Sequence, residues 1–234
     1  MRIGLLGYGK MGKIIEAIAL ERGHSVELKV SSNTTSYSVS NIDIAIDFST
    51  PEVAYANISK ALEEGVPIIS GTTGWLDEYE SVLELCKRYK GAFIYASNFS
   101  LGVNIFYQLN KQLAKMMQSQ SDYKTDITEI HHTEKKDAPS GTAITLAEQI
   151  IEDTSYEQWA LEPSTNPKIL PIISKRISEV SGTHTVNYSS EIDSITLTHT
   201  AHSRKGFALG AVIAAEWLLG KTGVFTMQDV LNIR

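Results

Sequence analysis

Short runs of apolar and β-branched residues alternate with stretches of helical period along the first hundred residues. The apolar runs predict five strands, at 2–6, 26–30, 43–48, 67–70 and 92–95. Between these runs, apolar residues recur every three or four positions and predict helices at 10–22, 51–64 and 76–89. Regular alternation of strand and helix is typical of α/β proteins, so we expect a doubly wound parallel sheet.

The pattern changes after residue 102. A helical period covers 103–118 and is followed by predicted strands at 123–132, 169–173, 183–188 and 194–200, with a helix at 142–152. These elements predict a second, α+β domain with a mostly antiparallel sheet. Residues 207–219 are again helical and rich in small side chains, which would suit packing on the first domain. We therefore expect one domain of residues 1–102, completed by 205–234, and another of residues 103–204.

Composition narrows the class of partner. The chain has 234 residues, 42% of them hydrophobic, and a formal net charge of −6 without a basic tract. A small molecule is therefore a better partner than nucleic acid. The sequence has no apolar stretch near the roughly 18 residues of a membrane span and no signal-peptide core, so we expect a cytoplasmic protein. Cys86 is the single cysteine, which excludes an intrachain disulfide.

A glycine-rich turn, Gly7-Tyr8-Gly9-Lys10-Met11-Gly12, follows the first predicted strand and opens the first predicted helix. In this context Gly7 allows the tight turn, Gly9 lets a pyrophosphate approach the backbone, and Gly12 permits close packing of helix on strand. The helix N-terminus adds N–H donors and a positive dipole. The pattern predicts a Rossmann-type dinucleotide-binding domain.

The cofactor is predicted to be NADPH or NADH. An acidic residue at the end of the second strand would bind the ribose 2′-hydroxyl of NAD, but Ser31 and Ser32 stand there. NADPH is therefore admissible. Lys29 is either a ligand for the 2′-phosphate or an exposed strand lysine.

Two more loops follow predicted strands of the same sheet, Gly71-Thr72-Thr73 and Ala96-Ser97-Asn98-Phe99. Ligands of open α/β sheets bind at the carboxyl ends of strands, so these loops are candidates for lining the nicotinamide. Ordinary turn chemistry is an equally good interpretation of their composition.

Positive charge gathers in one segment of this net-acidic chain, His131-His132-Thr133-Glu134-Lys135-Lys136, just before a predicted helix. Ser140 is a plausible N-cap of that helix, and the free N–H groups at Gly141 and Thr142 would bind a carboxylate. An imidazole beside a bound anion is stabilised in its protonated form and can act as a general acid. The segment therefore predicts a site that binds an anionic substrate and protonates it.

Three other interpretations compete with this one. Adjacent histidines on a strand point to opposite faces, so one of them can be simply packed or solvated. Paired lysines are most often solvated surface. A metal site could join His184, His199 or His202 to the pair, but no spacing resembles HExxH, and we expect no metal.

The sequence resembles the 4-hydroxy-tetrahydrodipicolinate reductase (dihydrodipicolinate reductase) family over essentially its whole length. The most specific part is the run from His131 to Thr142, His-His-x-x-Lys-x-Asp-Ala-Pro-Ser-Gly-Thr. Further matching motifs are the glycine turn at 7–12, Asp47-Phe48-Ser49, Gly71-Thr72-Thr73-Gly74, Ser97-Asn98-Phe99-Ser100, Arg176, Gly182-x-His184 and His199-x-Ala-x-Ser-Arg204.

The resemblance implies NAD(P)H-dependent reduction of 4-hydroxy-tetrahydrodipicolinate to tetrahydrodipicolinate, on the diaminopimelate route to lysine. His131 matches the proton donor of the family, and Lys135 matches a lysine of catalysis and carboxylate binding. His132 matches a substrate contact, while Gly141 and Thr142 match a carboxylate clamp. The resemblance also implies a homotetramer joined through the second domain, with the cofactor on the first.

Two alternatives belong to other functional classes. The chain could be another two-domain NAD(P)-dependent dehydrogenase, but the arrangement from His-His-x-x-Lys to Ser-Gly-Thr argues against it. A non-catalytic NAD(P)-binding protein would keep the glycine turn without needing an acid beside a carboxylate clamp. The presence of both features favours the enzyme.

Overall fold

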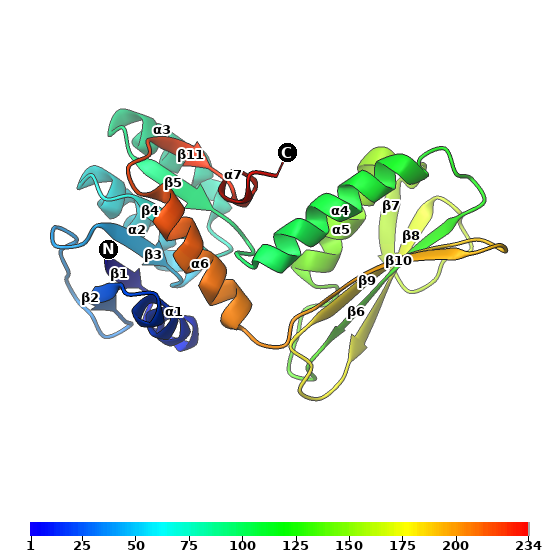
Figure 1. The fold of residues 1–234 in the computed structure, drawn as a ribbon, viewed down its shortest axis with the longest axis horizontal. Coiled ribbons are helices and arrows are strands. Elements are labelled where there is room, and N and C mark those ends of the chain that lie inside the picture. Colours follow the sequence, from blue (N-terminus) through cyan, green and yellow to red (C-terminus); the bar gives the residue numbers. More distant parts are fainter. Residues whose placement is uncertain (234) are drawn as a thin grey trace. The chain divides into compact units, whose positions relative to one another are not determined.

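A computed structural model describes residues 1–233 and divides the chain into two compact units (Figure 1). Unit 1 contains Met1–Leu101 and the chain from Arg204 onward, and unit 2 contains Gly102–Ser203. Each unit has its own sheet and its own hydrophobic core. None of the helices within residues 1–233 is long and apolar enough to cross a membrane.

The sheet of unit 1 has six parallel strands in the order β11-β5-β4-β3-β1-β2. Their bounds are β1 Arg2–Leu6, β2 Ser25–Val30, β3 Ile44–Asp47, β4 Ile68–Ser70, β5 Ala92–Tyr95 and β11 Gly223–Phe225. The strand order changes direction between β1 and β3, which is where open α/β sheets bind ligands. The predicted doubly wound parallel sheet is confirmed; β11, which completes its edge, was not predicted.

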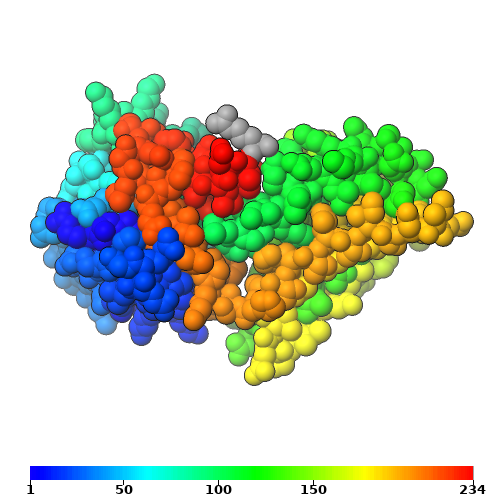
Figure 2. All heavy atoms as spheres, in the orientation of Figure 1, coloured from blue at the N-terminus to red at the C-terminus, as the bar shows by residue number. Residues whose placement is uncertain are grey.

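Helices cover both faces of this sheet. On one face lie α1 (Lys10–Glu21) and α6 (Lys205–Leu218), whose atoms adjoin in the space-filling view (Figure 2). On the other lie α2 (Pro51–Glu63) and α3 (Tyr79–Arg88). Successive strand residues point to opposite faces, so Leu5 packs in the first layer and Leu6 in the second. The short elements η1 (Leu76–Glu78) and α7 (Met227–Leu231) complete the unit.

The sheet of unit 2 has the order β10-β9-β6-β8-β7 and is mixed. Strand β9 is antiparallel to β6 and β10, while β8 is parallel to β6 and β7. The bounds are β6 Lys124–His131, β7 Gln158–Leu161, β8 Ile169–Arg176, β9 Thr183–Ser189 and β10 Ser194–Thr200. The predicted α+β class is confirmed. Strand β7 was not predicted, because its four residues, exposed at both ends, show no clear alternation of apolar and polar side chains.

One face of this second sheet is covered by α4 (Leu101–Met117) and α5 (Gly141–Asp153). Along β6, every second residue is buried on that helix-covered face: Thr125, Ile127, Glu129 and His131. Apolar packing therefore ends at Ile127, and the two residues that follow on the same face are ionisable. This change from apolar to ionisable residues positions the site described below.

Helix α6 approaches the backbone of the rest of unit 1 closely at Gly210. A Cβ at this position would lie 1.7 Å from the carbonyl oxygen of Phe99, so a side chain would force the helix away from its neighbour. We expect Gly210→Ala to lower the free energy of unfolding by about 1–3 kcal/mol, measured by urea unfolding followed by circular dichroism.

Gly206→Ala in the same helix is the matched control. Its Cβ would meet the Ser100 hydroxyl at 3.6 Å, an ordinary contact, and alanine favours helix over glycine. We expect this variant to be as stable as the unsubstituted protein or more so. A loss in Gly206→Ala equal to that in Gly210→Ala would show that the close approach at Gly210 does not account for its effect.

Candidate active site

The loops that follow β1 and β3 meet at the switch point of the first sheet. Gly7 has φ +103°, and a Cβ on it would lie 2.1 Å from the carbonyl oxygen of Phe48. Gly12, at the start of α1, would place a Cβ 2.6 Å from the carbonyl oxygen of Gly7. Both positions therefore require glycine, one for backbone conformation and close approach, the other for helix packing.

A cleft of about 550 Å³ opens beside these loops within unit 1. Its lining includes Gly7, Tyr8 and Gly9 from the glycine turn, Ser31 and Ser32 after β2, and Ser49 after β3. A Cβ on Gly9 would meet no atom within 4 Å, so the backbone there faces open space. An open glycine backbone at the start of α1, with hydroxyls at the far side, fits the pyrophosphate and ribose of a dinucleotide.

Asp47, at the end of β3, holds the loops around this cleft. Its carboxylate is fully buried and accepts hydrogen bonds from Ser49 (2.6 Å), Asn57 (2.9 Å), Ser70 (2.9 Å) and Thr72 (2.6 Å). Burial raises the pKa of Asp47, although these four donors favour the anion. Ser49 and Asn57 line the cleft, so the shape of its wall depends on this carboxylate.

The other predicted cofactor residues lie at the same edge of the sheet. Gly71 packs so closely on Phe48 that a Cβ would be 2.4 Å from its ring, and Phe99 lies 5.8 Å from that ring, centroid to centroid. Thr72 turns its hydroxyl toward Asp47. Lys10 and Met11 are in the first turn of α1, Thr73 follows β4, and Ala96, Ser97 and Asn98 follow β5.

Lys29 is paired within the protein. Its ammonium contacts the carboxylate of Glu16 at 2.5 Å and lies 5.1 Å from the centre of the Tyr8 ring. The structure therefore favours the interpretation of Lys29 as an exposed strand lysine, because its ammonium already has a partner within the protein. Ser31 and Ser32 remain the polar residues of the cleft at the end of β2.

The predicted catalytic segment lies in unit 2, where strand register gathers ionisable groups. Glu129 of β6 is paired with His184 of β9, and His131 is paired with Arg176 of β8. Since Glu129 and His131 share a face of β6, all four side chains meet on the helix-covered side of the sheet. Residues about 50 positions apart in the sequence are thereby brought into one cluster.

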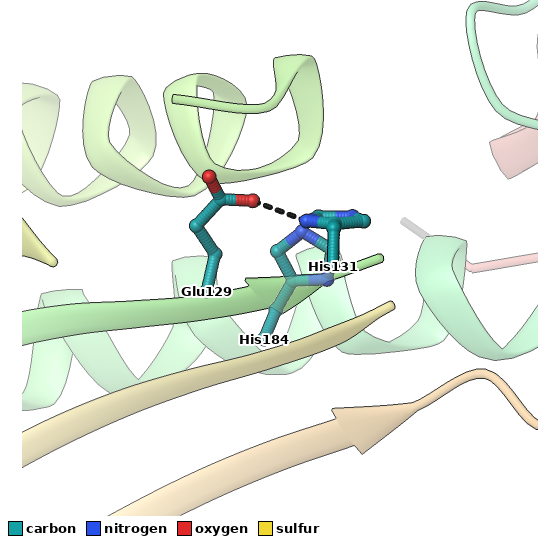
Figure 3. Close-up of side chains that lie close together, drawn as sticks. All are labelled: Glu129, His131 and His184. Carbon is teal, nitrogen blue, oxygen red and sulfur yellow. Dashed lines mark ion pairs between the residues drawn. The ribbon is translucent and has the colours of Figure 1, made fainter. Parts of the chain in front are cut away.

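Figure 3 shows Glu129, His131 and His184 of this cluster, with the ion pair between Glu129 and His131 as a dashed line. The Nδ1 atom of His131 lies 2.5 Å from Oε2 of Glu129, and the guanidinium of Arg176 donates to Oε1 at 3.1 Å. The rings of His131 and His184 are edge to face with centroids 5.0 Å apart. Glu129 has no exposure to solvent, and both histidines are buried.

Charge is distributed unequally within the cluster. Burial opposes ionisation of Glu129, but contacts from His131, Ser174 and Ser140 outweigh burial and keep the pKa of Glu129 well below its usual value. Burial, together with the nearby His131, lowers the pKa of His184 to about 3. Near neutral pH, Glu129 is therefore an anion and His184 is a neutral ring.

The predicted cap of α5 is confirmed: the Ser140 hydroxyl accepts from the N–H of Ala143 at 3.2 Å. The same hydroxyl lies 2.9 Å from Nε2 of His184, and the Ser140 N–H donates to Glu129 at 3.3 Å. Gly141 and Thr142 are the next two residues, at the start of α5, where backbone N–H groups lack acceptors within the helix. The predicted carboxylate clamp thus begins beside the cluster.

The two remaining predicted residues follow the end of β6. His132 is partly buried just beyond the strand. Lys135 binds the carboxylate of Asp137 at 2.7 and 2.9 Å, and its ammonium lowers the pKa of that carboxyl. Arg176 donates to the backbone carbonyl of Asp137 at 2.7 Å, which ties this loop to the cluster.

A metal is a poor fit to this geometry. Glu129, His131 and His184 can each offer one ligand atom, all within 4.8 Å of one another. However, the ligand atoms of one zinc stand about 3.3 Å apart, given bonds of about 2.0–2.1 Å, whereas Glu129 and His131 are 2.5 Å apart. The guanidinium at Oε1 adds a positive charge that would repel a cation. The arrangement suits an ion-pair network better.

The sequence analysis assigned no role to Glu129 or Asp47, although both are buried carboxylates next to predicted site residues. A signal for Glu129 was available, because two-residue alternation places it on the same face as His131. Asp47 had a weaker signal: an acidic residue directly after the apolar run of β3. The partners of both come from distant elements and could not be identified from the sequence.

Comparison with known proteins covers nearly the whole chain. A family model described as "Dihydrodipicolinate reductase, N-terminus" matches residues 1–99, and one described as "Dihydrodipicolinate reductase, C-terminus" matches residues 102–231. A 4-hydroxy-tetrahydrodipicolinate reductase of Christiangramia forsetii is 54% identical over 99% of this chain and 98% of its own. A 4-hydroxy-tetrahydrodipicolinate reductase of Neisseria meningitidis serogroup C is 33% identical over 93% of this chain and 84% of its own.

A solved structure has the same fold. Dipicolinate-bound dihydrodipicolinate reductase from Paenisporosarcina sp. aligns with a TM-score of 0.80 over 98% of each chain, at 22% sequence identity. At this identity the likeness supports the fold, both the parallel six-stranded sheet and the second sheet.

Proposed function

Because the chain belongs to the dihydrodipicolinate reductase family, we propose that its two units supply the hydride and the proton for reduction of 4-hydroxy-tetrahydrodipicolinate to tetrahydrodipicolinate. Members of this family use NADH or NADPH, and the chain is an NAD(P)H-dependent oxidoreductase of lysine and diaminopimelate biosynthesis. The roles of individual residues below are part of the proposal.

One observation carries the residue assignment: His131 contacts a buried carboxylate and lies beside the N-terminus of α5. The helix N-terminus, with the N–H groups of Gly141 and Thr142 and the Thr142 hydroxyl, binds a substrate carboxylate. Lys135 and His132 add positive charge and hydrogen-bond donors around the same anion. The Nδ1 atom of His131 contacts the carboxylate of Glu129, and His131 acts as the general acid.

The cleft of unit 1 holds the reduced nicotinamide cofactor. Residues 7–12, of which 7–9 line the cleft, bind the pyrophosphate, and Ser31 and Ser32 face the adenosine ribose. The loops at 71–73 and 96–99 are outside the cleft lining; they follow β4 and β5 of the same sheet and contact the nicotinamide end. A reduced nicotinamide held by these residues would supply the hydride for the conjugated imine that forms when the hydroxylated substrate loses water. His131 supplies the proton that completes the reduction.

The competing functions have less support. Another two-domain dehydrogenase would not need the cluster of imidazole, carboxylate and helix N-terminus, and a cofactor-binding protein without activity would not need a buried carboxylate against an imidazole. The proposal is tested by mixing the protein, NADPH or NADH, and the product of dihydrodipicolinate synthase. We expect oxidation of the cofactor only when all three are present; its absence with both cofactors would refute the assignment.

We expect His131→Ala to lower kcat by about 10²–10⁴-fold, the usual range for loss of a general acid. NADPH binding should change little, because the cofactor cleft is formed by residues of unit 1. Steady-state kinetics and cofactor titration by fluorescence separate the two effects. Unchanged turnover would show that His131 is not the general acid. A loss of cofactor binding alone would show that His131 has a role in binding the cofactor instead.

We expect Ser32→Asp to lower kcat/KM for NADPH, relative to kcat/KM for NADH, by about tenfold or more, because a carboxylate there would repel the 2′-phosphate. The unsubstituted protein should accept NADPH at least as well as NADH. Ser36→Asp adds the same charge at an exposed position outside the cleft lining and serves as the control. The measurement is kcat/KM for each cofactor; equal shifts in both variants would indicate a general charge effect.

The proposal includes a homotetramer in the cytoplasm, joined through residues 103–204. Strand β10 is an edge of its sheet and is exposed in the space-filling view (Figure 2). Ile192, which precedes it, is 92% exposed, and Ile195 within it is also exposed. Exposed apolar side chains on an open edge are a common basis for symmetric assembly.

Light scattering across a dilution series tests the assembly. We expect a tetramer in the unsubstituted protein and smaller species in Ile195→Lys, because a buried charge would disfavour the interface. Glu191→Lys, at a neighbouring exposed position, controls for the added charge. A monomer that keeps full activity at every concentration would refute the proposal.

A further inference from the structure

The roles assigned above do not explain why the carboxylate of Glu129 contacts several groups of the site. Its carboxylate has no solvent exposure, and it lies at the centre of the cluster in unit 2. A buried carboxylate is costly unless donors and positive charges surround it. The way these partners divide between its two oxygens indicates what the residue does.

The Oε2 atom of Glu129 contacts His131, the proposed proton donor. It lies 2.5 Å from Nδ1 of His131, so a proton on that nitrogen would lie next to the carboxylate. Nε2 is then the nitrogen that can deliver a proton. Next to Nε2 is Gly182, where a Cβ would come within 3.1 Å, so the absence of a side chain leaves room on that side of the ring.

The Oε1 atom of Glu129 accepts hydrogen bonds from two neighbouring segments. It accepts from Arg176 of β8 at 3.1 Å and from the backbone N–H of Ser140 at 3.3 Å. Ser140 caps α5 and directly precedes Gly141 and Thr142. One carboxylate thus contacts both the imidazole and the first turn of the helix that forms the clamp.

We infer that Glu129 is a positioning residue that fixes the His131 ring, with Nδ1 protonated and Nε2 free to act, at a set distance from the carboxylate clamp on α5. This inference rests on the proposed function. It assigns no substrate contact to Glu129. The carboxylate acts through His131 and Ser140, as an acidic residue orients a catalytic imidazole in other enzymes.

The neutral ring of His184 supports the same assignment. It contacts Ser140 and stacks edge to face on His131, but no carboxylate ion pair is made to it within residues 1–233. Two adjacent imidazoles would repel if both were charged, and the carboxylate of Glu129 forms its ion pair with the ring of His131. His184 therefore packs against the acid and supports the cap.

The first test needs no turnover. In protein labelled with ¹⁵N-histidine, we expect the neutral His131 ring to keep its proton on Nδ1 at alkaline pH. The signals are assigned by their loss in His131→Ala. In Glu129→Gln, the neutral ring should populate both tautomers. Proton occupancy on Nε2 alone in the unsubstituted protein would overturn the inference.

The second test is kinetic and compares Glu129→Gln with Glu148→Gln, which removes the same charge from an exposed position on α5. The glutamine oxygen can still accept from Arg176 and Ser140, so the clamp should be retained. We expect kcat of Glu129→Gln to fall about 10–100-fold, less than for His131→Ala, with substrate KM and NADPH affinity within about threefold. Glu148→Gln should match the unsubstituted protein.

Unchanged kcat in folded Glu129→Gln would overturn the inference, as would a loss confined to KM. If that variant does not fold, Glu129→Asp is measured instead. The shorter side chain keeps the negative charge but moves it away from His131. A kcat equal to that of the unsubstituted protein would then refute a positioning role. Absence of turnover in the unsubstituted protein would instead refute the proposed function. The tautomer of His131 would still test the contact with Glu129.

Discussion

A carboxylate excluded from water must be surrounded by donors and positive charge, and in unit 2 the site is arranged around one such group. Glu129 obtains these partners from β6, β8 and the cap of α5. The same contacts that stabilise the anion also orient His131 and hold the start of α5. One set of contacts therefore both stabilises the buried charge and sets the geometry of the proposed active site.

Unit 1 shows a related use of a buried carboxylate. Asp47 accepts hydrogen bonds from four residues, in the loop after β3, in α2, at the end of β4 and in the loop after β4. Two of these residues, Ser49 and Asn57, line the cleft proposed to hold the cofactor. Gly7 and Phe48 approach so closely that a side chain on the glycine is excluded. The cleft is thus shaped by backbone contact at Gly7 and by the hydrogen bonds of the buried Asp47 carboxyl group.

The concentration of positive charge in a net-acidic chain also has a physical explanation. His131, His132, Lys135 and Lys136 lie at the end of β6, where packing against the helices gives way to ionisable residues. Some of this charge is balanced locally, by Glu129 and by Asp137. A dicarboxylate substrate would supply the remainder, which is consistent with the reductase family to which the chain belongs.

The sequence by itself determined the features that depend on neighbouring residues. Helical and strand periods predicted the two sheets, local turn chemistry identified the glycine turn, and Ser140 was recognisable as a helix cap. Only the tertiary structure decided the partners of Glu129, Asp47 and Lys29, and the edge strands β7 and β11. These depend on strand register and long-range pairing, which join residues far apart in the chain and leave no periodic signal in the local sequence.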